Sequence, residues 1–262
     1  MKQVTRKGVY LIPNLFTTGN LFSGFYATVA VFNAEYVVAA IAILIAMVFD
    51  TLDGKAARST GTISRFGVEY DSLADLVSFG VAPGLLIYSW ALSAYGRIGW
   101  VAAFLFIVCG ALRLARYNIQ ASGRESMDFT GLPIPVAASM IATTVLLDDH
   151  ILRLGKEVKP ILILAITYVL AFLMVSTMRY RSFKNFDLWE RKPFHFLVTM
   201  VLILILFVAA PQPMLFGVFA FYVLWGIIER PVVALTRRAW RRPELTPVEE
   251  AEELEDPEIA VK

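Results

Sequence analysis

Four aspartates are the residues of this sequence best suited to chemistry, because of where they lie. Asp50 and Asp53 come at the end of an apolar run, and Asp71 and Asp75 come at the start of the next one. Ionised carboxylates in such places are costly unless a bundle interior, a partner or a cation receives them. On a helix with 3.6 residues per turn, spacings of three and four put each pair on one face. If the two helices are antiparallel neighbours, the four carboxylates converge at one boundary of the membrane.

Such a convergence of carboxylates requires cations. Unit charges about 4 Å apart repel by several kcal/mol at an intermediate dielectric constant. Two hard divalent cations, Mg²⁺ or Mn²⁺, would cancel the four charges, and Mg²⁺ commonly shares its coordination between carboxylates and substrate phosphates. Gly54 and Ala57 leave room for a ligand near the backbone, while Lys55 and Arg58 can neutralise phosphate oxygens. The sequence therefore predicts a site for a diphosphate.

The composition indicates whether this site forms in a soluble protein or in a membrane protein. The chain has 262 residues, of which 58% are hydrophobic and 18% are charged, and its mean hydropathy is +0.64. These values indicate a polytopic membrane protein and not a soluble domain. The net charge of +2 is too small to indicate a nucleic-acid partner. One cysteine, Cys109, excludes an intramolecular disulfide, and two histidines leave little material for a zinc site or a serine triad.

Apolar runs along the chain predict an all-α polytopic membrane protein with about eight transmembrane helices. Lysine and arginine gather in alternate loops, including the stretch 230–242, which puts both termini and the aspartates on the cytoplasmic side. No internal repeat is visible, so transporter folds built from inverted repeats gain no support. The predicted spans are 11–32, 36–57, 72–94, 98–117, 132–148, 160–178, 194–210 and 214–230.

The aspartates belong to the pattern D-x2-D-G-x2-A-R-x8-G-x3-D-x3-D, which resembles the signature of the CDP-alcohol phosphotransferase family. Members of that family transfer a substituted phosphate from a CDP-linked donor to an alcohol and release CMP. The resemblance implies that the aspartates of the pattern hold two divalent cations, Mg²⁺ or Mn²⁺. It also implies that Asp71 and Asp75 are catalytic, with Asp75 accepting the proton of the acceptor hydroxyl. The matching residues are Asp50, Asp53, Gly54, Ala57, Arg58, Gly67, Asp71 and Asp75.

Three further segments are similar to the phosphatidylserine synthase branch of this family. They are Ile12–Thr17, Leu112–Asn118 and Phe129–Pro135, and Met174–Thr177 adds a weaker match. The branch implies CDP-diacylglycerol as donor, L-serine as acceptor, a six-helix core extended by two C-terminal helices, and a homodimer. On this interpretation residues 1–242 form the integral membrane catalytic domain. The acidic residues 243–262 form a disordered cytoplasmic tail.

Five residues of these segments are candidate ligands, and four of them have an alternative role. Asn14 and Thr17 either contact the nucleotide or hydrogen-bond between helices. Arg113 and Arg116 either mark the cytoplasmic end of a helix, or one of them binds the serine carboxylate or a lipid phosphate. Asn118, in the same segment, is the third candidate for the acceptor site.

Other functions remain open from the sequence alone. Within the family, glycerol 3-phosphate and inositol phosphate are rival acceptors, and an archaeal-type ether lipid is a rival donor. A carboxylate-based transporter would not need Gly54, Ala57 and Arg58 at these spacings. A purely structural membrane protein predicts no metal dependence.

Overall fold

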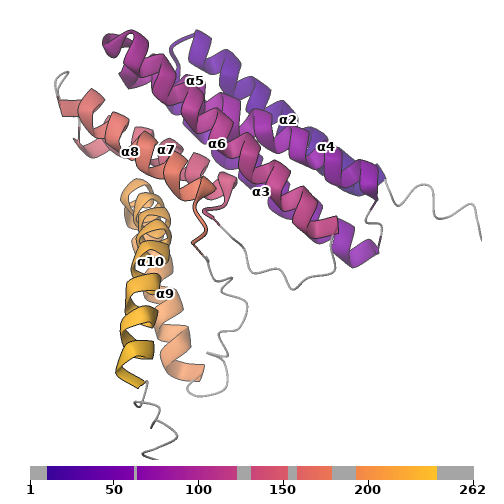
Figure 1. The fold of residues 1–262 in the computed structure, drawn as a ribbon, viewed down its shortest axis with the longest axis vertical. Coiled ribbons are helices and arrows are strands. Elements are labelled where there is room, and N and C mark those ends of the chain that lie inside the picture. Colours follow the sequence, from indigo (N-terminus) through magenta and orange to yellow (C-terminus); the bar gives the residue numbers. More distant parts are fainter. Residues whose placement is uncertain (1–10, 62–63, 123–130, 153–157, 179–192, 241–262) are drawn as a thin grey trace, which may run out of the picture. The chain divides into compact units, whose positions relative to one another are not determined.

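The computed structural model describes residues 11–61, 64–122, 131–152, 158–178 and 193–240, and it is helical almost throughout (Figure 1). No β-strand occurs within these ranges. The helices are α2 (Leu11–Phe32), α3 (Tyr36–Thr60), α4 (Arg65–Asp75), α5 (Ala82–Ile87), α6 (Arg97–Ser122), α7 (Ile134–Leu147), α8 (Val158–Val175), α9 (Pro193–Ala209) and α10 (Pro211–Trp240). The wider π-helical turns are η1 (Leu76–Val81), η2 (Tyr88–Leu92) and η4 (Asp148–Leu152), and η3 (Ser93–Tyr95) is a 3₁₀ turn.

Each predicted apolar segment lies on a helix, so the all-α membrane class is confirmed. Among the described residues, six helices are long and apolar enough to cross a membrane. The apolar stretches of α8 and α9, Pro160–Val175 and Val198–Ala209, are shorter. The predicted count of eight therefore exceeds the six that meet this length. The acidic segment 243–262 lies outside the described residues, and its disorder stays a prediction.

The connection between the two aspartate helices is short. Helix α3 continues to Thr60 and ends where Gly61 takes a left-handed conformation, with φ of 62°. Helix α4 begins early because the Ser64 hydroxyl accepts a hydrogen bond from the Gly67 amide at 3.0 Å. Arg58 is thus in the last turn of α3 and Gly67 in the first turn of α4.

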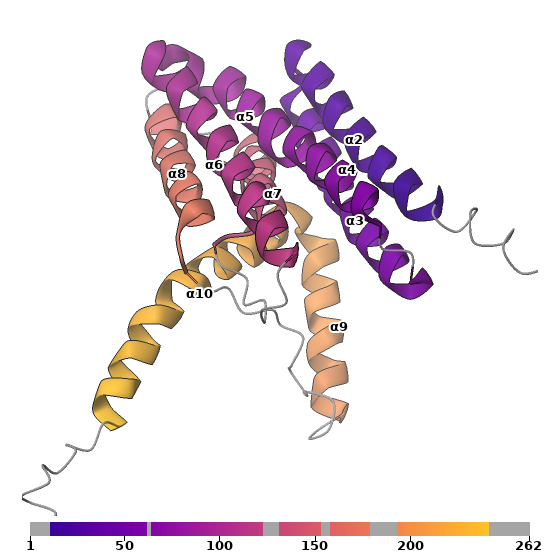
Figure 2. The same ribbon diagram turned by 45° about the vertical axis from the view of Figure 1, so that its right-hand side comes forward.

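Helix α2 packs against α3, α4, η1 and α5, so it contacts both helices that carry aspartates (Figures 1 and 2). Small residues line this packing, because Ala27 of α2 and Ala39, Ala40 and Ala46 of α3 are all fully or almost fully buried. Small side chains let helix backbones approach closely in a membrane. Helix α7 is buried over nearly its whole length and contacts α3, while α8 packs on α6.

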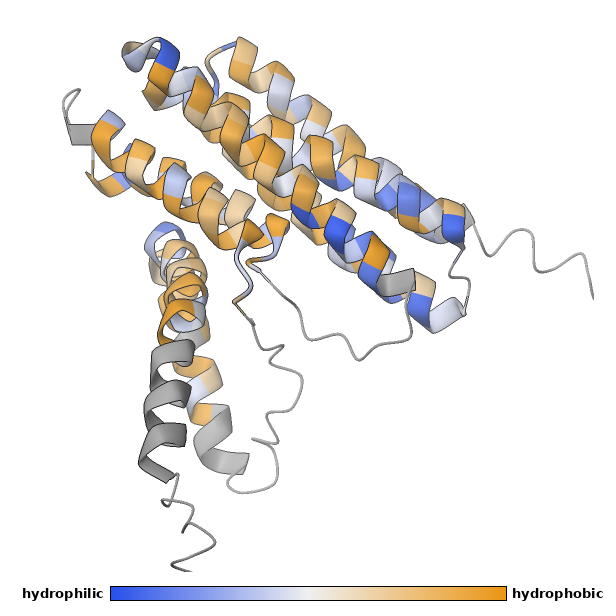
Figure 3. Cartoon of the chain, viewed as in Figure 1, coloured by the Kyte–Doolittle hydropathy of each residue, from blue (hydrophilic) through white to orange (hydrophobic). Residues whose placement is uncertain are grey.

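Hydrophobic residues make up most of these helices (Figure 3), and many large apolar side chains are exposed, as a membrane-spanning protein requires. Phe22, Phe25 and Phe32 of α2 are examples of large exposed side chains. Hydrophilic residues gather at the end where α3 stops and α4 starts (Figure 3). The chain forms two compact units, Met1–Gly226 and Ile227–Lys262, and the described part of the second is the end of α10.

Helix α2 and η1 approach each other closely at Gly24. A Cβ atom added to Gly24 would overlap with the side chain and the backbone of Ser78. Both residues are buried. Glycine at this position therefore sets the separation of the two helices.

Gly24→Ala should destabilise the protein by about 1–3 kcal/mol, because the added methyl group overpacks this contact. The measurement is the midpoint of thermal unfolding in detergent. Gly217→Ala is the matched control, since a Cβ at that helical glycine of α10 meets nothing within 4 Å. Equal midpoints for the two variants would contradict the assigned role of Gly24.

Candidate active site

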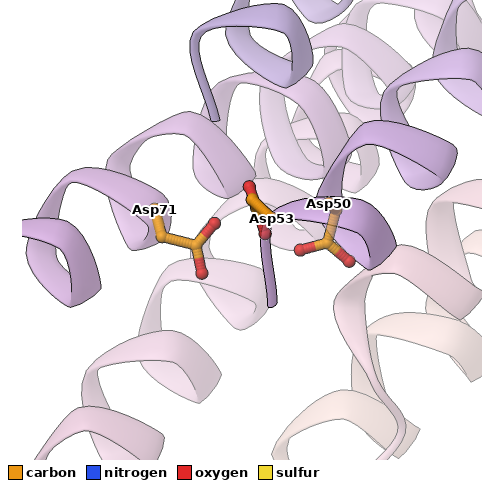
Figure 4. Close-up of side chains that lie close together, drawn as sticks. All are labelled: Asp50, Asp53 and Asp71. Atoms are coloured by element: carbon orange, nitrogen blue, oxygen red, sulfur yellow. The ribbon is translucent and has the colours of Figure 1, made fainter. Parts of the chain in front are cut away.

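Three of the four aspartates meet at the polar end of α3 and α4. Each of Asp50, Asp53 and Asp71 offers a carboxylate oxygen, and these three oxygens lie within 4.8 Å of one another. Figure 4 shows the carboxyl groups turned toward a common centre from the two helices. Asp53 is buried, whereas Asp50 and Asp71 are half-buried. The sequence-based expectation that the two pairs approach each other is correct for these three residues.

This group of oxygens fits a hard divalent cation. Carboxylates are the ligands that Mg²⁺ and Mn²⁺ prefer, and three such ligands can surround one ion. Asp71 Oδ1 is buried and has no hydrogen-bond partner among the described residues. A buried carboxylate oxygen without a donor is costly, and a bound cation would satisfy it.

Asp75 lies one turn beyond Asp71 and is not part of the group within 4.8 Å. It is buried, and it lies within electrostatic range of Asp50 and Asp71. Its Oδ1 accepts a hydrogen bond of 2.9 Å from the side-chain amide of Asn20 on α2. Asp75 is therefore adjacent to the three-aspartate group but has a protein donor of its own. Its role as a metal ligand stays a prediction.

Helix α2 also contacts the carboxylates of α3. The buried hydroxyl of Thr17 lies 3.0 Å from Asp53 Oδ2 and can donate to it, or to the carbonyl oxygen of Pro13 at 3.1 Å. Thr17 thus makes the hydrogen bond between helices that was one of its two expected roles. Asn14 lies one turn earlier, and its Oδ1 would be 3.6 Å from a Cβ added to Gly67. Asn14 is therefore beside the start of α4, and its contact with a nucleotide stays a prediction.

Arg58 supplies positive charge at the open side of the cluster. Its side chain is exposed and lies within electrostatic range of Asp50 and Asp53. The guanidinium group folds back over Gly54, where an added Cβ would be 3.5 Å from Arg58 Nη1. Ala57, half-buried, is the other small residue in this turn. An anion bound here would therefore lie close to the positive charge of Arg58 and beside the small residues Gly54 and Ala57.

The three candidate residues of α6 have different surroundings. Arg113 is half-buried within electrostatic range of Asp75 and Asp50, and its Nε is buried without a hydrogen-bond partner in the described part of the chain. Arg116 Nη1 instead donates to the carbonyl oxygen of Val175, at the end of α8, at 3.1 Å. Of the two arginines, Arg113 is the one whose charge faces the aspartates.

Asn118 joins α6 to α4. Its amide lies 3.0 Å from Ser72 Oγ and 3.3 Å from Glu69 Oε2, and both are possible acceptors. Glu69 is exposed and Ser72 is half-buried. The polar contacts between α4 and α6 therefore extend from buried Asp75 to the surface.

One partner of an aspartate, Asn20, and the residue that contacts it, Ser78, were missed from the sequence. Asn20 interrupts the apolar first helix three residues after Thr17, so its shared face with Thr17 was the available signal. Ser78 donates to the carbonyl oxygen of Asn20 at 2.9 Å, and its position three residues after Asp75 was a weaker signal. Polar residues on one face of a membrane helix commonly hydrogen-bond across to a neighbour.

Comparisons with known proteins agree with this site. The family model for CDP-alcohol phosphatidyltransferase matches residues 10–175. CDP-diacylglycerol–serine O-phosphatidyltransferase of Helicobacter pylori (strain ATCC 700392 / 26695) is 39% identical over 222 residues, 84% of this chain and 91% of the relative. The protein of the same name from Bacillus subtilis (strain 168) is 37% identical over 174 residues, 66% of this chain and 92% of the relative.

An archaeal protein is also similar. Archaetidylserine synthase of Methanothermobacter thermautotrophicus is 42% identical over 134 residues, which cover 50% of this chain and 56% of the relative. The match of the family model covers more than half of the chain and includes α2 to α8, with all four aspartates. The chain therefore belongs to the CDP-alcohol phosphatidyltransferase family.

Proposed function

We propose that this enzyme is a metal-dependent CDP-diacylglycerol–serine O-phosphatidyltransferase. It transfers a phosphatidyl group from CDP-diacylglycerol to the hydroxyl of L-serine, and the products are phosphatidylserine and CMP. The observation that carries this proposal is the group of three carboxylates at the polar end of apolar helices. The names of the two bacterial relatives support serine as the acceptor.

In this proposal Asp50, Asp53 and Asp71, together with Asp75, hold one or two divalent cations, Mg²⁺ or Mn²⁺. When bound, such cations neutralise charge on the phosphoryl oxygens and assist departure of the nucleotide. Arg58 supports the same function from the protein side, because its exposed guanidinium can donate two parallel hydrogen bonds to phosphate oxygens. Gly54 and Ala57 leave space for the diphosphate beside α3.

The donor nucleotide is proposed to lie near the start of α2, where Asn14 and Thr17 are candidates for contact with it. The Thr17 hydroxyl can donate a hydrogen bond to Asp53. Its effect on the nucleotide is then indirect, because it orients this carboxylate. Asn14 is half-buried beside Gly67, at the edge of the cluster. This arrangement keeps the acyl chains in the bilayer while the polar head group reaches the aspartates.

The chemical step is a displacement at the phosphorus that carries the diacylglycerol group. The serine oxygen forms a bond to this phosphorus, and the bond from phosphorus to the CMP oxygen breaks. Asp75 accepts the proton of the serine hydroxyl, and CMP leaves with the bonding electron pair. Asp75 suits this role because it lies beside the three-aspartate group.

Arg113 is proposed to bind the serine carboxylate. Its charge faces Asp75 and Asp50, and its Nε has no hydrogen-bond partner in the described ranges. A guanidinium is suited to hold a carboxylate by charge-assisted hydrogen bonds. Arg116, which donates to Val175, and Asn118, which contacts Glu69 and Ser72, are then residues that hold the helices around the acceptor.

The protein is an integral membrane protein, and we propose that the active site and both termini face the cytoplasm. The support is the concentration of lysine and arginine in the loops on that side. Homodimerisation rests on the family resemblance. A second candidate function uses an ether-lipid donor with the same acceptor, and similarity to the archaetidylserine synthase favours it.

Purified protein supplied with CDP-diacylglycerol and Mg²⁺ or Mn²⁺ should release CMP with L-serine as the acceptor. Glycerol 3-phosphate and inositol phosphate should give little CMP in the same assay, because their phosphate charge does not match a site with one facing arginine. A chelator should abolish the release. CMP release with none of the acceptors would contradict the enzyme proposal, and faster release with a phosphorylated acceptor would contradict serine.

Arg113→Ala should raise the serine KM by about 10- to 100-fold, because hydrogen bonds to charged groups contribute about 1.5–3 kcal/mol. The KM for CDP-diacylglycerol should change much less. Arg116→Ala is the matched control on the same helix, and it should lower the unfolding midpoint by releasing the end of α8. An unchanged serine KM in Arg113→Ala would exclude Arg113 from the acceptor site.

A further inference from the structure

Asn20 is fully buried in α2, and the α4–η1 segment contacts it twice. Its side-chain amide donates to Asp75 Oδ1 at 2.9 Å. Its backbone carbonyl oxygen accepts a hydrogen bond from the hydroxyl of Ser78, also at 2.9 Å. Asp75 and Ser78 are three residues apart, so one face of the α4–η1 segment holds both the backbone and the side chain of Asn20.

The approach of the two helices makes these contacts possible. Gly24 lies one turn after Asn20, and any side chain there would overlap with Ser78. Ser78 is itself fully buried, in the wide turn η1 that begins directly after Asp75. Wide turns of this kind occur frequently at functional sites. The position of Asn20 relative to Asp75 is therefore fixed from both helices.

The hydrogen bonding of Asn20 is incomplete in a way that packing alone does not explain. Asn20 Oδ1 is buried and has no hydrogen-bond partner within the described residues. Leaving a buried acceptor unpaired costs free energy, and an apolar side chain of similar size would avoid that cost. The one hydrogen bond that the side chain makes goes to Asp75. The benefit of an amide at this position is thus the control of that carboxylate.

We propose that Asn20 is a positioning residue for the phosphatidyl transfer, acting through Asp75. The amide holds Asp75 Oδ1 and so orients the carboxyl group that receives the proton of the serine hydroxyl. The amide itself takes no proton, and the bonds formed and broken are those of the proposed displacement. This inference rests on the proposed function, in which Asp75 is the base.

Helix α2 then orients one carboxylate on each side of the cluster. Thr17 contacts Asp53 of α3, and Asn20, three residues later on the same face, contacts Asp75 at the end of α4. The two contacts differ in kind, because the Thr17 hydroxyl has Pro13 as an alternative acceptor. For Asn20 Nδ2, the hydrogen bond to Asp75 is the one that the described structure contains.

Asn20→Ala should lower kcat for CMP release with L-serine by about 10- to 100-fold, the effect of a lost hydrogen bond to a charged group. The KM values for serine and CDP-diacylglycerol should stay within about threefold, since the hydrogen bonds of Asn20 within the described residues go to Asp75 and Ser78 and not to Arg113 or Arg58. Asn20→Asp keeps the shape of the side chain and loses the donor, so it should lose at least as much kcat. Ser23→Ala is the control, because the hydrogen bond that this buried hydroxyl of α2 makes in the described part of the chain goes to the Gly19 carbonyl oxygen of its own helix, at 2.9 Å.

A second readout separates positioning from folding. In an Asp75→Asn background, Asn20→Ala should cause no further loss of residual CMP release, because residues that act through one another are not additive. The unfolding midpoint of Asn20→Ala should remain near that of Ser23→Ala. A parent-like kcat in Asn20→Ala, a further tenfold loss in the double variant, or a joint fall of kcat and the unfolding midpoint would each overturn the inference. Parent protein that releases no CMP would instead overturn the proposed function.

Discussion

Holding several carboxylates at the end of an apolar helix bundle is the constraint on which the rest of this structure depends. The aspartates of α3 and α4 repel one another and lose hydration, so each needs a donor or a cation. Helix α2 provides donors to both sides, through Thr17 to Asp53 and through Asn20 to Asp75. The remaining oxygens of Asp50, Asp53 and Asp71 are left to face one another, which is the arrangement that a divalent cation stabilises.

The close packing of α2 follows from the same constraint. Alanines between α2 and α3, and Gly24 against Ser78, bring the backbones near enough for short polar side chains to reach the carboxylates. In a membrane, where helix association has little hydrophobic driving force, such contacts also contribute to stability. The residues that build the site and the residues that hold the bundle together are therefore partly the same.

The fold class and the three-aspartate group followed from the sequence because their signals are local. Apolar runs predict the helices. Spacings of three and four residues place Asp50 with Asp53, and Asp71 with Asp75, on one face of a helix. The partners across helices did not follow, because spacing within one segment carries no information about which helix lies beside it. Asn20 and Ser78 were missed for this reason. The sequence also could not show that Arg113 faces the aspartates whereas Arg116 donates to Val175. The count of eight membrane crossings stays a prediction, because the apolar stretches of α8 and α9 are shorter than those of the six described helices that are long enough to span.

The most direct test of this account is phosphatidylserine formation in liposomes by Asp53→Asn and by Glu35→Gln, measured by mass spectrometry with and without divalent cation. Asp53 belongs to the aspartate group, whereas Glu35 is exposed just before the opposite end of the same helix. Asp53→Asn should lose more than about 100-fold in rate, because even indirect partners of metal ligands contribute about 10- to 100-fold. Glu35→Gln should match the parent and require the cation. Phosphatidylserine formation by Asp53→Asn at a rate close to that of the parent would contradict the account.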